Sequence, residues 1–263
     1  MTRESALPSD RRRQVGVTVA EVLCVIGTLV GVGALGGTTV QEAAGGALAA
    51  DATLIAPAGP AFAIWTPIYL GLAAYTVWQW LPEQATDRRH RSIGWLAAAS
   101  MLLNAAWLLV IQAGWLWLSV LVIAALAGTL GVLVARLQEN PSYGVAESVV
   151  TDGTFGLYLG WVTVAACANV TAALAGSGAD LGDAANVAAA VLVLAAAAVL
   201  GWVLADRLGG RWAVASAAAW GLAWVGWGRL AAEPSSAVVG LAALAAAAVV
   251  LVGAARVHSR LAT

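Results

Sequence analysis

The chain has 263 residues, of which 61% are hydrophobic and only 10% are charged, and its formal net charge is -1. Soluble domains carry about a quarter charged residues, so this composition excludes a soluble globular protein and predicts an integral membrane protein. The low density of positive charge also excludes the basic patch that nucleic-acid binding needs.

Apolar runs predict eight membrane-spanning helices, because about 20 apolar residues are needed to cross a bilayer. The first run is too long for a cleaved signal segment and is interpreted as a retained span. In chain order the predicted spans are Val15–Gly36, Pro60–Leu81, Ile93–Ile111, Trp115–Leu137, Val149–Leu174, Ala184–Ala205, Trp212–Ala231 and Ser236–Arg256.

The arginines predict the orientation of these spans. All 13 positively charged side chains are arginines, and eight spans place 12 of them on one side. They are Arg3, Arg11, Arg12, Arg13, Arg88, Arg89, Arg91, Arg136, Arg207, Arg211, Arg256 and Arg260. Arginine concentrates on cytoplasmic loops, which predicts cytoplasmic N- and C-termini. Only Arg229 breaks the pattern. The outer side carries Glu42, Asp51, Asp180, Asp183 and Glu233.

Glycine pairs four residues apart occur in the first span (Gly27 and Gly31) and in the fifth (Gly156 and Gly160). Small residues at this spacing let two helices approach closely, so a packing role is favoured over a ligand role. The two cysteines, Cys24 and Cys167, match neither a metal-ligand spacing nor a disulfide framework, and we interpret them as buried free thiols.

The longest outer loop runs from Gly37 to Gly59 and is rich in glycine and alanine. A loop of this length is either a flexible connector or a lid, and its composition by itself favours the connector. Pro60, which follows it, suits the first turn of a helix, where its missing N–H is not needed.

Three segments place aromatic and amide side chains inside apolar helices: Phe62–Tyr69, Leu103–Trp107 and Tyr158–Asn169. In lipid such groups are costly unless they face each other or a ligand, so we predict a pocket for a flat hydrophobic molecule between these spans. A kink at Pro67 is expected to widen it. The alternative is that tryptophans mark the membrane interface and asparagines join helices, at about 1 kcal/mol each.

The remaining ionisable groups give weaker signals. Asp152, like Glu21 and Glu147, lies near the predicted inner boundary. A place in a proton or ion path is one interpretation of Asp152. The favoured interpretation is a carboxylate that is either solvated or favourably placed at the start of the fifth span. His90 and His258 are predicted to lie in inner loops, where they cannot form a pair of haem ligands within the membrane, and no nucleophile–base arrangement indicates an enzyme.

Taken in order, the Trp65–Tyr69 phrase, the Asn-x-x-Trp at Asn104 and the Tyr-Leu-x-Trp phrase from Tyr158 to Asn169 resemble the TspO/MBR translocator family. The long bacterial form, the tryptophan-rich sensory proteins, is most similar. The resemblance implies a five-helix bundle over residues 15–174 in which loop 37–59 is a lid above a pocket for porphyrins, sterol-like lipids or aromatic drugs. The ligand-binding residues predicted from the stripes and the resemblance are Phe62, Trp65, Tyr69, Asn104, Trp107, Tyr158, Trp161, Ala165 and Asn169.

The predicted fold is therefore an all-α integral membrane protein, with a five-helix TspO-like bundle and about three additional transmembrane helices. Residues 1–14 form a cytoplasmic tail, and residues 175–263 form the three-helix extension with a short cytoplasmic tail. Trp220, Trp224 and Trp227 in the extension share a stripe. Packing against the core is the favoured interpretation of this stripe, ahead of an extended pocket or contact with a second subunit.

The predicted function is a membrane binding or sensory protein for a planar hydrophobic ligand, either tetrapyrrole-like or a lipid. A transporter of a small amphipathic solute is the alternative, and a porphyrin-degrading enzyme ranks third. No cofactor or metal is required, and porphyrin or haem is a candidate ligand. The predicted partners are the lipid bilayer, that ligand and, as a candidate, a second copy of the chain.

Overall fold

The computed structural model describes residues 7–34, 36 and 38–261. Arg3 and Gly37, which the predicted tail and outer loop include, lie outside these residues. The described part of the chain is helical and contains no strand. Its elements are α1 (Pro8–Gly31), α2 (Ala43–Gly46), the 3-10 helix η1 (Gly59–Ile64), α3 (Trp65–Trp78), α4 (Arg88–Gln112), α5 (Leu116–Glu139), α6 (Val145–Glu147), the π-helical turn η2 (Ser148–Gly153), α7 (Thr154–Gly176), α8 (Asp183–Arg207), α9 (Trp212–Ala231) and α10 (Ala237–Leu261).

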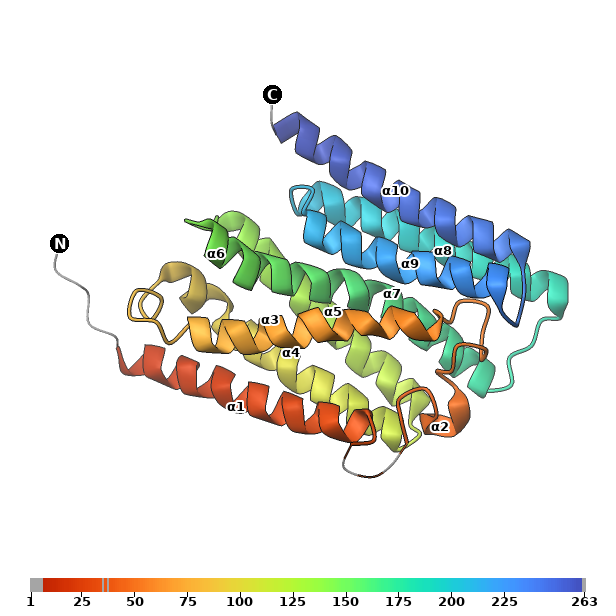
Figure 1. Cartoon of the computed structure of the whole chain (residues 1–263), viewed down its shortest axis with the longest axis horizontal. Helices are drawn as coiled ribbons and strands as arrows, with labels where there is room; N and C mark the ends of the chain where they lie inside the picture. Colours follow the sequence, from red (N-terminus) through yellow and green to blue (C-terminus); the bar gives the residue numbers. More distant parts are fainter. Residues whose placement is uncertain (1–6, 35, 37, 262–263) are drawn as a thin grey trace.

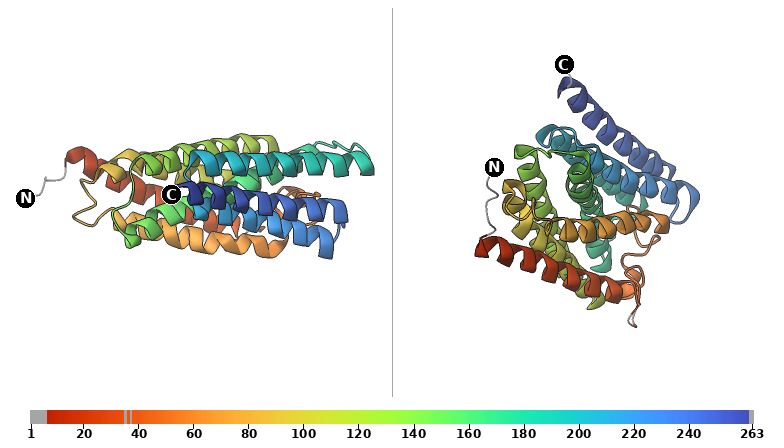
Figure 2. Two further views of the ribbon diagram at one scale, coloured as in Figure 1. Left: turned by 90° about the horizontal axis from the view of Figure 1, so that it is seen from above. Right: turned by 60° about the vertical axis from the view of Figure 1, so that its left-hand side comes forward.

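A long helix forms at each of the eight predicted spans, and seven of these segments are long and apolar enough to cross a membrane. The exception is α9, a 20-residue helix whose tryptophans, glycines and Arg229 lower its mean hydropathy. The helices run side by side along one direction (Figures 1 and 2). The protein is thus an all-α integral membrane protein, as its composition predicts.

Several helices begin or end beyond the predicted spans, because helix formation does not require apolar residues. The clearest case is α4, which starts at Arg88, where the Asp87 carboxylate accepts hydrogen bonds from the backbone N–H groups of Arg89 (2.7 Å) and His90 (3.3 Å). This is a helix N-cap, a stabilising start signal. It places His90 in a helix, and His258 likewise lies in α10, so the prediction that both belong to loops is wrong.

The helices form two packed groups. One hydrophobic core lies among α1, α3, α4, α5 and α7, and a second lies mainly among α8, α9 and α10. The groups join along α7, which packs against α5 on one side and α9 on the other, and Figure 1 shows α8–α10 as a layer beside α7. The last three helices are therefore attached to the helix that carries Tyr158 and Trp161.

The two predicted glycine pairs lie at close contacts between helices. A Cβ atom added at Gly27 would come within 2.9 Å of the Ala105 side chain on α4, and one at Gly160 within 2.1 Å of the Val214 carbonyl oxygen on α9. Only a residue without a Cβ allows this separation. The prediction that these glycines serve packing is confirmed by this geometry.

The segment around Pro67 differs from the prediction. The chain forms a turn of 3-10 helix from Gly59 to Ile64, with Pro60 in its first turn as expected, and the α-helix starts only at Trp65. Pro67 thus occupies the first turn of α3, where a missing N–H breaks no helical hydrogen bond. The change from 3-10 to α geometry therefore lies directly before Trp65, and Pro67 is not in the middle of an α-helix.

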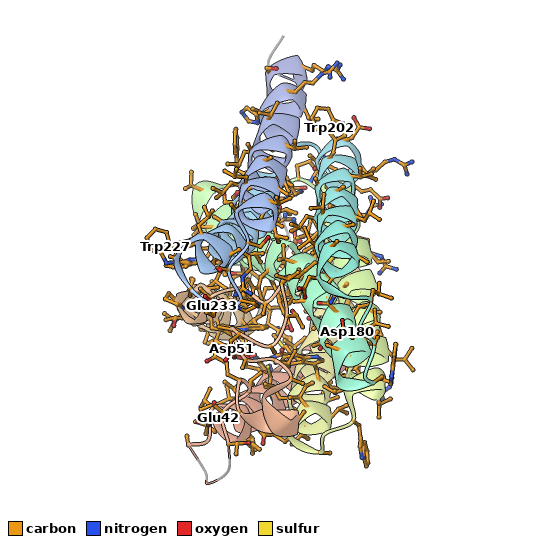
Figure 3. The ribbon with its side chains drawn as sticks, turned by 90° about the vertical axis from the view of Figure 1, so that its right-hand side faces the viewer. Glu42, Asp51, Asp180, Trp202, Trp227 and Glu233 are labelled. Atoms are coloured by element: carbon orange, nitrogen blue, oxygen red, sulfur yellow. The ribbon has the colours of Figure 1, made fainter. Side chains whose placement is uncertain are left out.

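The two ends of the bundle differ in charge. At the end that holds the N- and C-terminal segments, arginines join neighbouring helices, for example Arg91 to Asp10 (2.7 Å) and Arg136 to the Ser92 carbonyl oxygen (2.6 Å). We call this the arginine end. Figure 3 shows the opposite end, where Glu42, Asp51, Asp180 and Glu233 lie. This separation of charge agrees with the distribution on which the predicted orientation rests.

Candidate functional site

The candidate site lies near the end of the bundle opposite to the arginine end. It is covered by residues 38–58, which we call the lid loop. Two adjoining cavities meet there. The deep cavity, about 40 Å³, is enclosed by η1, α3, α4, α5, α7 and the lid loop. The vestibule, about 350 Å³, is bounded by α1, η1, α3, α4 and the first part of the lid loop. Phe62, Trp65 and Trp107 line both, so the two cavities share an aromatic wall.

The structure brings seven of the nine predicted site residues to these cavities. Phe62, Trp65, Asn104, Trp107, Trp161 and Ala165 line the deep cavity, and Tyr69 lines the vestibule. Tyr158 and Asn169 lie behind the walls and are buried. Ligand contact by these residues stays a prediction.

The aromatic side chains form one continuous group. The ring of Trp65 stacks on Tyr69, with centroids 5.1 Å apart and planes 17° apart. Trp65 also meets Tyr158 and Trp161 edge-to-face, with ring centroids 5.8 Å and 6.3 Å apart. Phe62 meets Trp161 edge-on at 5.6 Å. Edge-to-face and offset contacts fix ring orientation, so the wall is held in place before any ligand arrives.

The two residues behind the wall orient it through hydrogen bonds. The indole N–H of Trp107 donates to Asn169 Oδ1 at 2.9 Å, and Asn169 Nδ2 donates to Ser119 Oγ at 2.8 Å. The hydroxyl of Tyr158 donates to the Ser100 carbonyl oxygen at 3.2 Å. Asn169 and Tyr158 thus position rings from outside the cavity. Asn104 acts similarly through Nδ2, which donates to the Tyr69 hydroxyl oxygen at 3.0 Å.

Three polar atoms around the deep cavity have no hydrogen-bond partner among the described residues. They are Thr53 Oγ1, Asn104 Oδ1 and Trp161 Nε1, and each is buried. An unpaired buried donor or acceptor costs about 1–3 kcal/mol. The set contains an acceptor at Asn104, a donor at Trp161 and a hydroxyl that can do either at Thr53. The deep cavity is therefore apolar with a few unpaired polar groups, which is the usual make-up of a small-molecule site.

The lid loop supplies residues that the sequence did not indicate. Ala47, Leu48, Thr53, Ala56 and Pro57 line the deep cavity from above, and Ile55 beside them is 2% exposed. The loop is therefore a cover over the cavity and not a free connector. The apolar Leu54-Ile55-Ala56 run inside an outer loop was the available signal, because such a run is expected to be buried.

The first part of the lid loop has its own local structure. The backbone N–H and hydroxyl of Thr39 donate to the Glu42 carboxylate at 3.0 and 2.9 Å, and these bonds lower the pKa of that carboxyl. The Gln112 side chain at the end of α4 donates to the Thr38 carbonyl oxygen at 2.8 Å. These contacts place Val40 between the two cavities, which it lines on both sides.

The predicted tryptophan stripe on α9 divides into two parts. The indole N–H of Trp220 donates to the Ala61 carbonyl oxygen at 2.9 Å, and the ring of Trp224 packs on the five-helix core beside it. Trp227 is 61% exposed. Packing is thus the role of the first two tryptophans, as predicted, and Trp227 faces away from the core.

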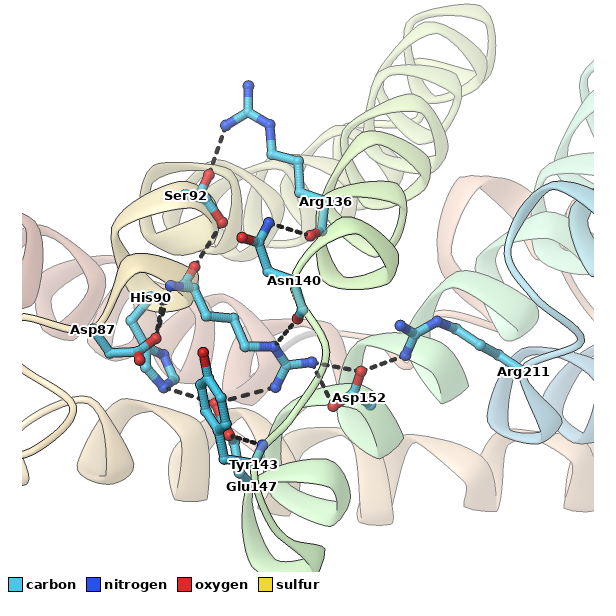
Figure 4. Close-up of polar contacts among 10 residues, drawn as sticks. Asp87, His90, Ser92, Arg136, Asn140, Tyr143, Glu147, Asp152 and Arg211 are labelled. Atoms are coloured by element: carbon cyan, nitrogen blue, oxygen red, sulfur yellow. Dashed lines mark hydrogen bonds and ion pairs between the residues drawn. The ribbon is translucent and has the colours of Figure 1, made fainter. Parts of the chain in front are cut away.

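A second polar cluster lies at the arginine end (Figure 4). Arg89 is buried and pairs with Asp152 at 2.6 Å and with Glu147 at 3.2 Å, and Arg211 also binds Asp152. The side chain of Asp152 is 13% exposed. Asp152 lies two residues before the start of α7, as one branch of the prediction has it, whereas the other branch, a solvated carboxylate, is wrong. The sequence does not reveal its partners, which are 63 and 59 residues away.

The same cluster includes three groups that can bind metal ions. Asp87, His90 and Glu147 bring one ligand atom each within 4.8 Å of one another. Asp87 already caps α4, and Glu147 pairs with Arg89 and accepts a hydrogen bond from the Tyr143 N–H at 3.0 Å. These carboxylates therefore have N–H and cationic partners, and the cluster is best explained as a network that joins the helix ends at this side of the bundle.

Comparison with known proteins gives one match. A family model described as TSPO-like protein matches residues 16–256, and so includes the helices of the extension as well as the five-helix group. No curated protein and no solved structure matches the chain.

Proposed function

Because the chain belongs to the TSPO-like family, we propose that it is a membrane binding or sensory protein for a flat, largely apolar small molecule. The ligand occupies the vestibule and extends into the deep cavity beneath the lid loop. With about 350 Å³, the vestibule falls within the range of about 300–1,000 Å³ that small-molecule sites span.

The observation that carries this proposal is the coincidence of unpaired polar atoms with an aromatic wall. Asn104 Oδ1 and Trp161 Nε1 both border the deep cavity without a partner among the described residues. Packing between helices does not explain them, because helix contacts normally satisfy such groups. A ligand that donates a hydrogen bond to Asn104 Oδ1 and accepts one from Trp161 Nε1 removes the free-energy cost of leaving these two buried atoms unpaired.

The aromatic wall favours a planar ligand. Trp65 and Trp107 border both cavities, so a flat ring system that passes from one to the other lies against their faces. A porphyrin has a flat apolar ring, pyrrole N–H donors and carboxylate acceptors, so protoporphyrin IX and haem remain the first candidates. A lipid with a rigid ring system is the second class of ligand with this chemistry.

The charge distribution supports an orientation. Arginines gather at the end that holds the chain termini, where buried Arg89 and partly exposed Arg91 join neighbouring helices. Arginine-rich ends face the cytoplasm, so we propose that both termini are cytoplasmic in a bacterial inner membrane. In that orientation the lid loop lies on the outer side.

A titration with protoporphyrin IX tests the proposed site. Tryptophan fluorescence quenching and the porphyrin absorption band are followed for the wild type and for Trp161→Phe, which keeps a ring but removes the N–H donor. We expect saturable binding that Trp161→Phe weakens about 2- to 10-fold, the value of one hydrogen bond. Thr53→Val, which removes the hydroxyl at constant shape, is expected to act in the same direction.

Trp115→Phe is the matched control, since Trp115 is 61% exposed and lines neither cavity. Equal affinity of the Trp161 and Trp115 variants would place the porphyrin elsewhere on the protein. Saturation by a rigid-ring lipid but not by porphyrin would keep the site and change the ligand class. Absence of saturation with either probe would contradict the proposal.

A further inference from the structure

Arg229 is the one arginine that departs from the charge pattern, and the structure places it against the lid loop. Its side chain extends from the end of α9 and the residue is 1% exposed. Nη1 donates to the Thr53 carbonyl oxygen at 3.0 Å, and Nη2 donates to the Ala50 carbonyl oxygen at 2.7 Å. The planar, permanently charged guanidinium group of Arg229 thus donates hydrogen bonds to two carbonyl groups of the lid loop.

Two further hydrogen bonds join the same part of the chain to α9. The backbone N–H of Ala58 donates to the Trp224 carbonyl oxygen at 3.2 Å. The indole N–H of Trp220 donates to the Ala61 carbonyl oxygen at 2.9 Å. Residues 50–61 are therefore fastened to α9 at four points, while residues 38 and 39 are bonded to α4 and to Glu42.

The fastened segment covers the deep cavity. Thr53, Ala56 and Pro57 lie between the attachment points and line the cavity from above. The side chain that fixes them belongs to α9, which packs on α7 directly beside Trp161, itself a lining residue. Helix α9 thus contacts the site in two places: it binds the lid loop that covers the deep cavity, and it packs on α7 behind Trp161.

We infer that α9 is a clamp that holds residues 50–61 closed over the deep cavity, and that Arg229 is its positioning residue. The inference rests on the proposed function for its effect on a ligand, but the clamp itself does not depend on the ligand's identity. A bound molecule leaves through the vestibule side, where the lid loop is attached to α4, and the α9 side stays shut. The clamp therefore sets how long a ligand stays in the deep cavity.

Amide hydrogen exchange on the ligand-free protein, in lipid nanodiscs, tests the clamp directly. Arg229→Gln removes the charge and the fork, and we expect exchange of the amides in residues 50–61, Ala58 in particular, to speed up about tenfold. Arg229→Lys keeps the charge without the two-pronged geometry, so an intermediate effect is expected. Amides in α4 and α5 are expected to stay as protected as in the wild type.

Arg256→Gln is the matched control. Arg256 is also an arginine of the extension, but its guanidinium lies 5.8 Å from the centre of the Trp202 ring, at the arginine end. Trp220→Phe is a second, independent way to weaken the clamp, because it keeps the ring and removes the donor to Ala61. It keeps the test decisive if the Arg229 variants do not fold.

The consequence for binding is read from the dissociation rate of protoporphyrin IX. We expect Arg229→Gln to raise this rate about tenfold, and Arg256→Gln to leave it unchanged. Unchanged exchange of residues 50–61 in both Arg229→Gln and Trp220→Phe would overturn the clamp. Faster exchange without any porphyrin binding by the wild type would support the clamp and reject the proposed ligand.

Discussion

Replacement of Gly160 by alanine is expected to separate the two helix groups. Gly160 lies on α7, next to Trp161, and faces the backbone of α9. An added Cβ would lie 2.1 Å from the Val214 carbonyl oxygen and 2.9 Å from the Ala217 side chain. The first of these atoms belongs to a helical backbone and cannot rotate away, so α9 itself has to move.

The size of the effect follows from that displacement. To restore ordinary contact, the helices have to separate by roughly 1 Å, and overpacking of this kind costs about 1–3 kcal/mol. We expect the upper part of this range, because the obstacle is backbone. For a chain of this size about 3 kcal/mol lowers the melting temperature by roughly 6 °C or more.

Gly128→Ala is the matched control. Gly128 lies on α5, and a Cβ added there would meet no described atom within 4 Å apart from its chain neighbours and the adjacent backbone of its own helix. Alanine at that position is expected to stabilise the helix by about 0.5–1 kcal/mol, because glycine lowers helix stability by that amount. The two variants are compared by thermal unfolding in the same detergent. A Gly160→Ala protein that melts at or above the temperature of Gly128→Ala would refute the close α7–α9 contact.

Three further substitutions test other parts of the structure. Glu21→Leu is expected to stabilise the protein by about 1–3 kcal/mol in thermal unfolding, because both carboxyl oxygens of this buried residue lack a partner among the described residues; a lower melting temperature would mean that the carboxylate has a role. Asp152→Asn is expected to lower the free energy of unfolding by roughly 3 kcal/mol, since it removes the charge that balances buried Arg89. Unchanged stability together with a loss of solute flux in vesicles would instead favour a transporter. Trp107→Phe leaves Asn169 Oδ1 without its donor and is expected to lower the free energy of unfolding by about 1–3 kcal/mol. A second change in the same protein, Asn169→Leu, is expected to recover part of this stability.

The positions of the helices follow from the sequence because a bilayer imposes a length. A run of about 20 apolar residues is required for each crossing. All eight predicted runs form long helices, and seven of them are long and apolar enough to cross a membrane. Periodicity within a helix is equally local, so Phe62, Trp65 and Tyr69 could be predicted to share a face. That is why most of the predicted site residues border the same two cavities.

Helix ends were harder to predict from the sequence. The start of α4 depends on a side chain, Asp87, that bonds to N–H groups and is not part of the apolar run. The role of Pro67 depends on where the α-helix begins, and a turn of 3-10 helix before Trp65 moved that point by several residues. Both features arise from local hydrogen bonds that compete with regular helix geometry.

Partners across helices were decided only by the tertiary structure. The sequence predicts that Asp152 lies at the start of the fifth span, but not that Arg89 of α4 and Arg211, just before α9, both pair with it. Asn169 likewise became a support for the Trp107 ring. A side chain's hydrogen-bond partner depends on which helix is adjacent and how that helix is rotated, and neither is contained in the periodicity of one segment.

The sequence by itself therefore determined the class of protein, the helical segments and the faces that carry aromatic and amide groups. The tertiary structure alone decided which lid-loop residues line the cavity and that α9 holds the loop there through Arg229. The reason is physical. Membrane insertion and helix formation depend on the residues of one segment, whereas the carbonyl groups of Ala50 and Thr53 could be satisfied only by a donor about 180 residues farther along the chain, which folding brings within 3.0 Å.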